Sequence, residues 1–163
     1  MTSRRSSMKI NFKNYISELN EAQMMTIQDL LNNFRKVFPY SDKDLSVITY
    51  HVDGKDTEDM ICTGVVQSEF EEFGKYKVTV KFHRDDIEQP FSVKNIGEVF
   101  CECKAFRYNT AYPDVQSKTF FGQIQGYNRI PNKVRNPEKT PSVCKHLYSF
   151  LIYLYNKGLI KNN

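Results

Sequence analysis

The segment YKVTVKFH, residues 76–83, has the strictest alternation of apolar and polar side chains in the chain. A period of two is typical of a β-strand that buries one face, because successive side chains of a strand point to opposite sides. The face expected in the core carries Tyr76, Val78, Val80 and Phe82, and the other face carries Lys77, Thr79, Lys81 and His83. This segment therefore predicts a strand that packs on one side against a hydrophobic core.

Further strands are expected on both sides of this segment. SVITYHV (46–52) is rich in β-branched and aromatic residues and runs into Asp53-Gly54, a tight-turn signal. MICTGVVQ (60–67) indicates the next strand. After an acidic loop, FSVK (91–94) and GEVFCECK (97–104) indicate two short strands or one broken strand. Together these stretches predict an antiparallel β-meander.

A helix is expected before the sheet. Apolar residues recur there at the three-and-four spacing of one helical face, namely Ile27, Leu30, Leu31, Phe34 and Phe38. Thr26 with Asp29 resembles a capping pair, and Asn20 with Glu21 is an equally good start. Pro39 ends the pattern, because proline cannot continue a helix.

A second helix is expected at the C-terminal end. Thr140-Pro141 has the N-cap and first-position residues of a helix, and Gly158 has the residue type that follows one. The segment 142–158 is apolar on nearly every side, which indicates burial on more than one side. The residues expected in its own core are Val143, Leu147, Phe150, Leu151 and Leu154. Those expected to need the N-terminal helix or another subunit for burial are Tyr148, Ile152 and Tyr155.

The composition is that of a soluble globular protein, with 163 residues, 40% hydrophobic and 26% charged. No apolar run approaches the roughly 20 residues that span a bilayer, so no membrane partner is expected. MTSRRSSMKI has no apolar segment behind its charges, so secretion by a signal peptide is not expected. We therefore expect an intracellular, reducing location. Residues 1–9 are expected to be a flexible arm, and KINFKNYISEL (9–19) fits either a strand or another helical turn.

The cysteine pattern indicates a metal site. Cys101 and Cys103 lie two apart in an expected strand, so both side chains leave the same face. Cys144 and His146 lie at the start of the last helix, where a partly non-helical Cys144 allows the two side chains to converge. Three thiolates and one imidazole form a closed tetrahedral set for structural zinc. The sequence therefore predicts one structural Zn²⁺ per chain, against the alternative that these cysteines are ordinary buried side chains.

The arrangement Cys101-x-Cys103, an intervening segment and then Cys144-x-His146 resembles the SWIM-type zinc finger, whose CxC…CxH pattern lies on a β-hairpin followed by a helix. VFCECKAF and CKHLYSFLIYL resemble the two halves of that motif, over about residues 97–155. The resemblance implies the same four residues as metal ligands, and binding of DNA or protein rather than catalysis. The spacing between Cys103 and Cys144 exceeds the usual one, so residues 107–141 are identified as an insertion. RNPEKTPSVCKHLYSFLIYL also resembles structural proteins of tailed bacteriophages, which implies a location within a virus particle.

These features predict an α+β fold in three parts. Residues 1–9 form the arm, residues 10–96 the helix and antiparallel sheet, and residues 97–163 a zinc-stabilised module of hairpin, long loop and helix. The insertion (residues 107–141) is expected to be the long loop of that module. Its four prolines, two glycines and weak periodicity are typical of a functional loop.

Charge is distributed unevenly and indicates an anionic partner. Residues 1–100 hold 13 Lys+Arg and 16 Asp+Glu, whereas residues 101–163 hold 10 Lys+Arg and three acids. Basic and aromatic side chains alternate in and beside the insertion, which suits phosphates and bases or a protein interface. Packing onto the sheet is the alternative for the aromatics. The residues expected to bind the partner are Lys104, Arg107, Lys118, Arg129, Lys133, Arg135, Lys139, Tyr112, Phe121 and Tyr127.

Catalysis is not expected. The chain has no glycine-rich phosphate loop and no nucleophile elbow, and a Cys3His set leaves no open coordination position on a metal. Cys62 is expected to be a buried core thiol, and His51 and His83 ordinary strand histidines. The function expected is a non-catalytic interaction module, a subunit of a larger assembly such as a virion or a homo-oligomer, without a small-molecule substrate. The alternative is a DNA-binding protein that acts alone.

Overall fold

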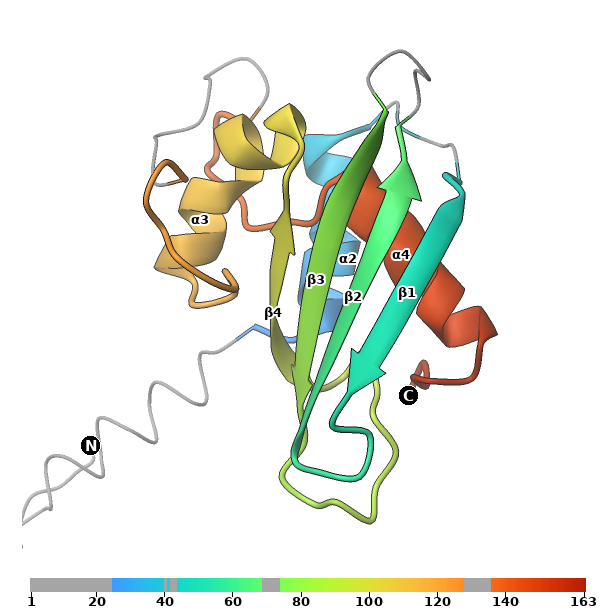
Figure 1. Cartoon of the computed structure of the whole chain (residues 1–163). Coiled ribbons are helices and arrows are strands. Elements are labelled where there is room, and N and C mark those ends of the chain that lie inside the picture. Colours follow the sequence, from blue (N-terminus) through green and yellow to red (C-terminus); the bar gives the residue numbers. More distant parts are fainter. Residues whose placement is uncertain (1–24, 40, 42–43, 69–73, 128–135) are drawn as a thin grey trace, which may run out of the picture.

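The computed structural model describes residues 25–39, 41, 44–68, 74–127 and 136–163. The expected arm and the segment 9–19 lie outside these residues. The described elements are α2 (Ile27–Val37), β1 (Val47–Asp53), β2 (Asp59–Gln67), β3 (Lys75–His83), β4 (Ile96–Cys101), the π-helix η2 (Phe106–Thr110), α3 (Ala111–Gln116) and α4 (Lys145–Asn156). Figure 1 shows α2 and α4 on one face of the sheet, with η2 and α3 beside β4. The α+β prediction is confirmed.

The sheet is the antiparallel meander that the alternation predicts, with the strand order β1-β2-β3-β4. Val80 of β3 pairs with Cys62 on one side and with Val99 on the other. The prediction of a strand at FSVK is wrong. The Asn95 side chain accepts a hydrogen bond from the Ser92 N–H at 2.8 Å and closes a turn there instead.

The core lies between the sheet and the two helices. Val78, Val80 and Phe82 are fully buried on the helix side of β3, which confirms the expected face. Gly64 of β2 lies directly beneath the Phe150 ring of α4, so a β-carbon there would overlap the ring. The close packing of α4 on β2 therefore requires a residue without a side chain at position 64.

Helix α2 begins at the Thr26 capping pair. The Asp29 N–H donates to Thr26 Oγ1 at 3.1 Å, and the Thr26 N–H donates to Asp29 Oδ2 at 2.9 Å. Thr26 itself is extended, with φ −87° and ψ 166°, so the alternative start at Asn20 is wrong for this helix. The helix ends at Val37, two residues before Pro39, as the sequence predicts.

Helix α4 begins four residues later than the Thr140-Pro141 signal predicts. Cys144 is still extended and serves as the N-cap. Two hydrogen bonds hold the chain before it: Asp114 accepts from the Ser142 N–H at 2.9 Å, and the Asn33 amide donates to the Pro141 carbonyl at 2.9 Å. The helix ends at Asn156 and Gly158 follows it with φ +78°.

The packing of α4 agrees with the expected core face. Its five expected core residues are all buried. On the other side, the Tyr148 ring stacks on Phe34 of α2 with the ring centroids 4.5 Å apart. Tyr155, by contrast, is 49% exposed. The N-terminal helix therefore covers one end of this side and leaves the other end open.

The prediction of a long irregular loop at residues 107–141 is wrong for its first third, because η2 and α3 occupy residues 106–116. Phe106, Phe120 and Tyr127 gather around Phe100 of β4, with ring centroids 5.2–6.0 Å from that of Phe100. This aromatic cluster (Phe100, Phe106, Phe120, Tyr127) gives the insertion a small core of its own. Phe120 forms a single parallel bridge with Val99 of β4, and the Phe121 N–H donates to the Val99 carbonyl.

Among the described residues, no helix has both the length and the apolar character needed to cross a membrane.

Candidate metal centre

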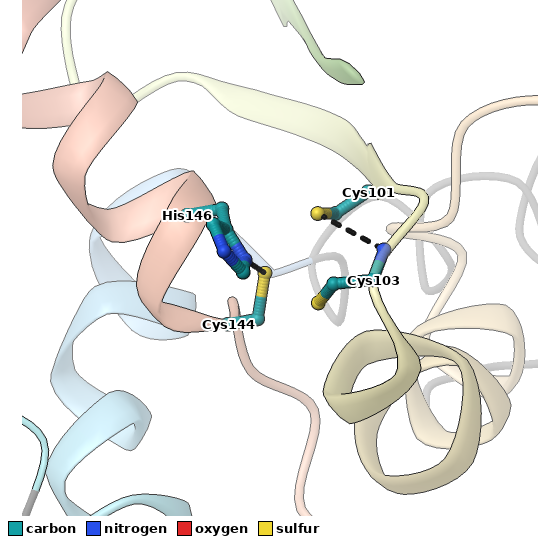
Figure 2. Close-up of side chains that lie close together, drawn as sticks. All are labelled: Cys101, Cys103, Cys144 and His146. Atoms are coloured by element: carbon teal, nitrogen blue, oxygen red, sulfur yellow. Dashed lines mark hydrogen bonds between the residues drawn. The ribbon is translucent and has the colours of Figure 1, made fainter. Parts of the chain in front are cut away.

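The metal ligands that the sequence predicts come from two parts of the chain. Cys101 is the last residue of β4, and Cys103 follows it before η2 begins. Cys144 is the N-cap of α4, and His146 lies in its first turn. Figure 2 shows the four side chains converging between the end of β4 and the start of α4.

The four ligand atoms lie close enough to share one ion, all within 4.8 Å of one another. Cys144 Sγ and His146 Nδ1 are 3.9 Å apart. In a tetrahedral zinc site, the metal–ligand bond lengths place neighbouring ligand atoms about 3.5–3.8 Å apart. A small contraction of the cluster would therefore complete the coordination shell.

The local backbone explains why these residues converge. Cys101 faces the helix side of the sheet, and the chain turns after it so that Cys103 lies beside it. Within a helix, residues two apart point in nearly opposite directions. Cys144 has φ −91° and ψ 177°, an extended conformation, so its thiol can reach the same space as the His146 ring. The expectation of a partly non-helical Cys144 is confirmed.

The site is closed to solvent. The exposed fractions are 0% for Cys101 and Cys144, 3% for Cys103 and 2% for His146. The four side chains are therefore almost entirely withdrawn from solvent. The arrangement suits a metal with a structural role.

Electrostatics in the cluster favour ionisation of one thiol. Hydrogen bonds from Cys101 and Cys144 lower the pKa of Cys103 well below its ordinary value. The Phe106 N–H also donates to Cys103 Sγ at 3.3 Å. Burial raises the pKa of Cys101 and of Cys144. A bound metal would supply the positive charge that favours ionisation of all three thiols.

His146 is oriented for coordination through Nδ1, which faces the thiol of Cys144. The edge of the Tyr76 ring packs against the imidazole, with centroids 4.8 Å apart and an angle of 62° between the ring planes. The other ring nitrogen, Nε2, is buried and has no hydrogen-bond partner among the described residues. The Tyr76 contact thus helps to hold the ring with Nδ1 facing Cys144.

The remaining cysteine and histidines lie outside the cluster. Cys62 is buried in the core of the sheet, where desolvation raises its pKa to about 12, so the expectation of a core thiol is confirmed. His51 contacts Asp53, and His83 lies between Asp59 and Asp85 on the outer side of the sheet.

The expected partner-binding residues are spread over the insertion and its ends. Lys104, Lys118 and Lys139 are exposed, and Tyr112 and Phe121 are half-buried. Arg107 lies over the Tyr127 ring at 4.7 Å from its centroid, and Tyr127 belongs to the aromatic cluster. Packing therefore accounts for Tyr127. The residues that lie outside the described part of the chain are Arg129, Lys133 and Arg135.

Asp114 is a residue that the sequence interpretation overlooked. It is fully buried in α3, and its carboxylate holds the Ser142 backbone two residues before Cys144. Burial raises the pKa of Asp114 well above its ordinary value. Its one sequence signal is that it is the only acid between Glu102 and Glu138. Asp114 thus connects the insertion to the segment that positions a metal ligand.

Comparison of the chain with protein-family models, with curated protein sequences and with solved structures gave no significant match in any of the three. The SWIM-like pattern is therefore supported by the spacing and the convergence of the four ligands alone.

Proposed function

We propose that the protein is a non-catalytic, zinc-stabilised interaction module that serves as a subunit of a larger assembly. The observation that carries the proposal is the buried Cys3His cluster, because three soft thiolates and an imidazole are a donor set that selects zinc. Four protein ligands would fill the tetrahedral coordination of zinc, so no coordination position is left for a substrate. Zinc there stabilises structure instead of acting in a reaction.

The zinc would join parts of the chain that lie far apart in the sequence. Its ligands come from the end of β4, the residues between β4 and η2, and the start of α4. Binding free energies of structural zinc are on the order of 10 kcal/mol. That energy would hold the insertion in place and present its outer surface to a partner.

The insertion is the part of the module proposed to contact the partner. Lys118 and Lys139 expose their charges there, Lys104 does so just before it, and Tyr108 and Ile124 are 39% and 46% exposed. A surface of cations and large apolar groups suits another protein subunit with an acidic face, since both kinds of contact contribute at such interfaces. A phage particle is one assembly of this kind.

The experiment compares the parent with a Lys104→Gln/Lys118→Gln/Lys139→Gln variant by native mass spectrometry and sizing. We expect the parent to form an oligomer and the variant to dissociate at lower salt, with its zinc content and melting temperature unchanged. The matched control is Lys36→Gln/Lys55→Gln/Lys94→Gln, which removes the same charge from exposed lysines elsewhere.

A monomeric parent that binds unrelated duplex DNA, with an affinity that falls steeply as salt rises, would contradict the assembly role and identify a DNA-binding protein. Equal behaviour of the variant, the control and the parent would contradict a role of the insertion's lysines.

A further inference from the structure

A groove with a volume of about 300 Å³ is lined by residues of α2 and α4 together with Val93 and Asn162. Its apolar lining residues are Leu31, Val93, Tyr148, Leu151, Ile152 and Tyr155. Gln28, Asn32 and Asn162 complete the wall, so every lining residue is uncharged. Such a lining suits an apolar occupant and gives no charge attraction for a nucleic acid.

The open groove lies where the sequence predicts additional cover. Ile152 and Tyr155 belong to the side of α4 that is expected to need another element for burial. The Phe34–Tyr148 stack covers the start of this side, whereas Ile152 is half-buried and Tyr155 is 49% exposed. The groove is therefore the unfilled remainder of the contact between the two helices.

The chain itself supplies an apolar segment a few residues before α2. Five apolar side chains of residues 8–19 share one helical face, at the spacing i, i+4, i+7, i+8 and i+11: Met8, Phe12, Tyr15, Ile16 and Leu19. The opposite face would carry Ile10, Asn14 and Ser17. A helix over residues 8–19 would be about 18 Å long, enough to lie along the part of α4 that lines the groove.

The described residues place the start of α2, to which this segment is connected, beside the groove. The chain enters α2 through an extended Thr26, and the N–H groups of Ile27 and Gln28 donate to the carbonyls of Asn95 and Val93 at 3.0 and 2.8 Å. Gln28 and Val93 both line the groove. Only residues 20–25 separate Leu19 from Thr26, a span of at most about 25 Å. A short tether of this kind gives an effective concentration in the millimolar range.

We propose that residues 8–19 dock as an amphipathic helix in the α2–α4 groove, with Phe12 and Ile16 against Ile152 and Tyr155. The docked segment would complete the second layer of the fold and would close the groove to other partners. The proposal does not depend on the zinc, because no metal ligand lines the groove.

Hydrogen exchange on the full-length protein, read by mass spectrometry, tests this docking. In the parent we expect the amides of residues 8–19 to exchange at least about tenfold more slowly than a random coil. Phe12→Glu/Ile16→Glu should abolish that protection, and so should Ile152→Glu on the groove side. The matched controls are Asn14→Glu/Ser17→Glu on the opposite face of the segment and Asn156→Glu at the exposed end of α4, which should keep it.

Three results would overturn the proposal. Random-coil exchange of residues 8–19 in the parent would show that they do not dock. Equal protection in the Phe12→Glu/Ile16→Glu variant would show that another face of the segment is bound. Protection that increases with protein concentration over about a hundredfold range would identify the segment of a second copy as the occupant. Zinc content should be the same in all variants, which separates this test from that of the proposed function.

Discussion

At the scale of single residues, the four cysteines divide into one core thiol and three candidate metal ligands. Burial raises the pKa of Cys62 to about 12, whereas Cys103 receives hydrogen bonds that lower its pKa. The same residue type therefore has opposite chemistry at two buried positions. The pKa values differ because hydrogen bonds stabilise the thiolate of Cys103, whereas desolvation alone acts on Cys62.

This difference predicts the outcome of two matched substitutions. Cys103→Ser should lose bound zinc and lower the free energy of unfolding by on the order of 4–5 kcal/mol, the range of changes that remove a metal. Cys62→Ala should keep one zinc per chain and cost about 1 kcal/mol. Elemental analysis and urea unfolding measure the two effects. A Cys103→Ser protein that retains its metal would show that Cys103 is not a ligand.

Asp114 predicts a dependence of stability on pH. Burial raises its pKa in the folded protein above the value in the unfolded chain, so the folded state binds the proton more tightly. Its stabilising effect is complete below about pH 4 and is lost as pH rises through the folded pKa. Asp114→Asn keeps an acceptor for the Ser142 N–H and stays neutral. In urea unfolding from pH 4 to 8, the free energy of unfolding of the variant should rise relative to that of the parent by up to about 1.4 kcal/mol per pH unit. Parallel curves of unfolding free energy against pH would contradict a buried carboxyl.

The residue scale also shows what sequence can and cannot predict. The ligand set Cys101, Cys103, Cys144 and His146 was predictable from its paired spacing, but the expected strand ends at Cys101 and a turn brings Cys103 beside it. Asp114 was not predictable, since a single acid between Pro113 and Val115 has no pattern. Its role depends on Ser142, 28 residues away, and only the fold brings the two together.

At the scale of elements, one glycine allows α4 to pack closely against β2. The Phe150 ring fills the space where Gly64 would carry a β-carbon. Gly64→Ala should therefore force α4 outward and cost about 1–3 kcal/mol. In a Phe150→Leu background the same substitution should cost less, because the smaller side chain leaves room. Urea unfolding of the four proteins measures the coupling, and additive free energies would show that ring and strand do not contact.

The elements themselves were predictable where the pattern of apolar residues repeats over a long stretch. β2, β3 and α2 agree with the sequence to within a residue or two, because each has several turns or pleats of one pattern. The helices η2 and α3 were missed because both are short and α3 contains Pro113. That proline lies in the first turn of α3, where the lack of an N–H is tolerated. The start of α4 was misplaced because contacts to Asn33 and Asp114 extend the chain before it.

At the scale of the whole molecule, the metal site lies where segments far apart in the sequence meet. The end of β4, the residues that lead from it into η2, and the start of α4 converge on it, with 40 residues between Cys103 and Cys144. The order of the strands followed from the turns between them. The packing of η2 and α3 beside β4 did not follow from the sequence, because it depends on the aromatic cluster, whose members recur at no regular spacing.

The central claim is that one zinc ion holds these three segments together. X-ray absorption at the zinc edge, with elemental analysis of the freshly purified and reduced full chain, tests it most directly. The account predicts one zinc per chain, with three sulfur neighbours near 2.3 Å and one nitrogen near 2.0–2.1 Å. Protein without metal, or a zinc ion with an oxygen ligand in place of one of the sulfurs, would contradict it.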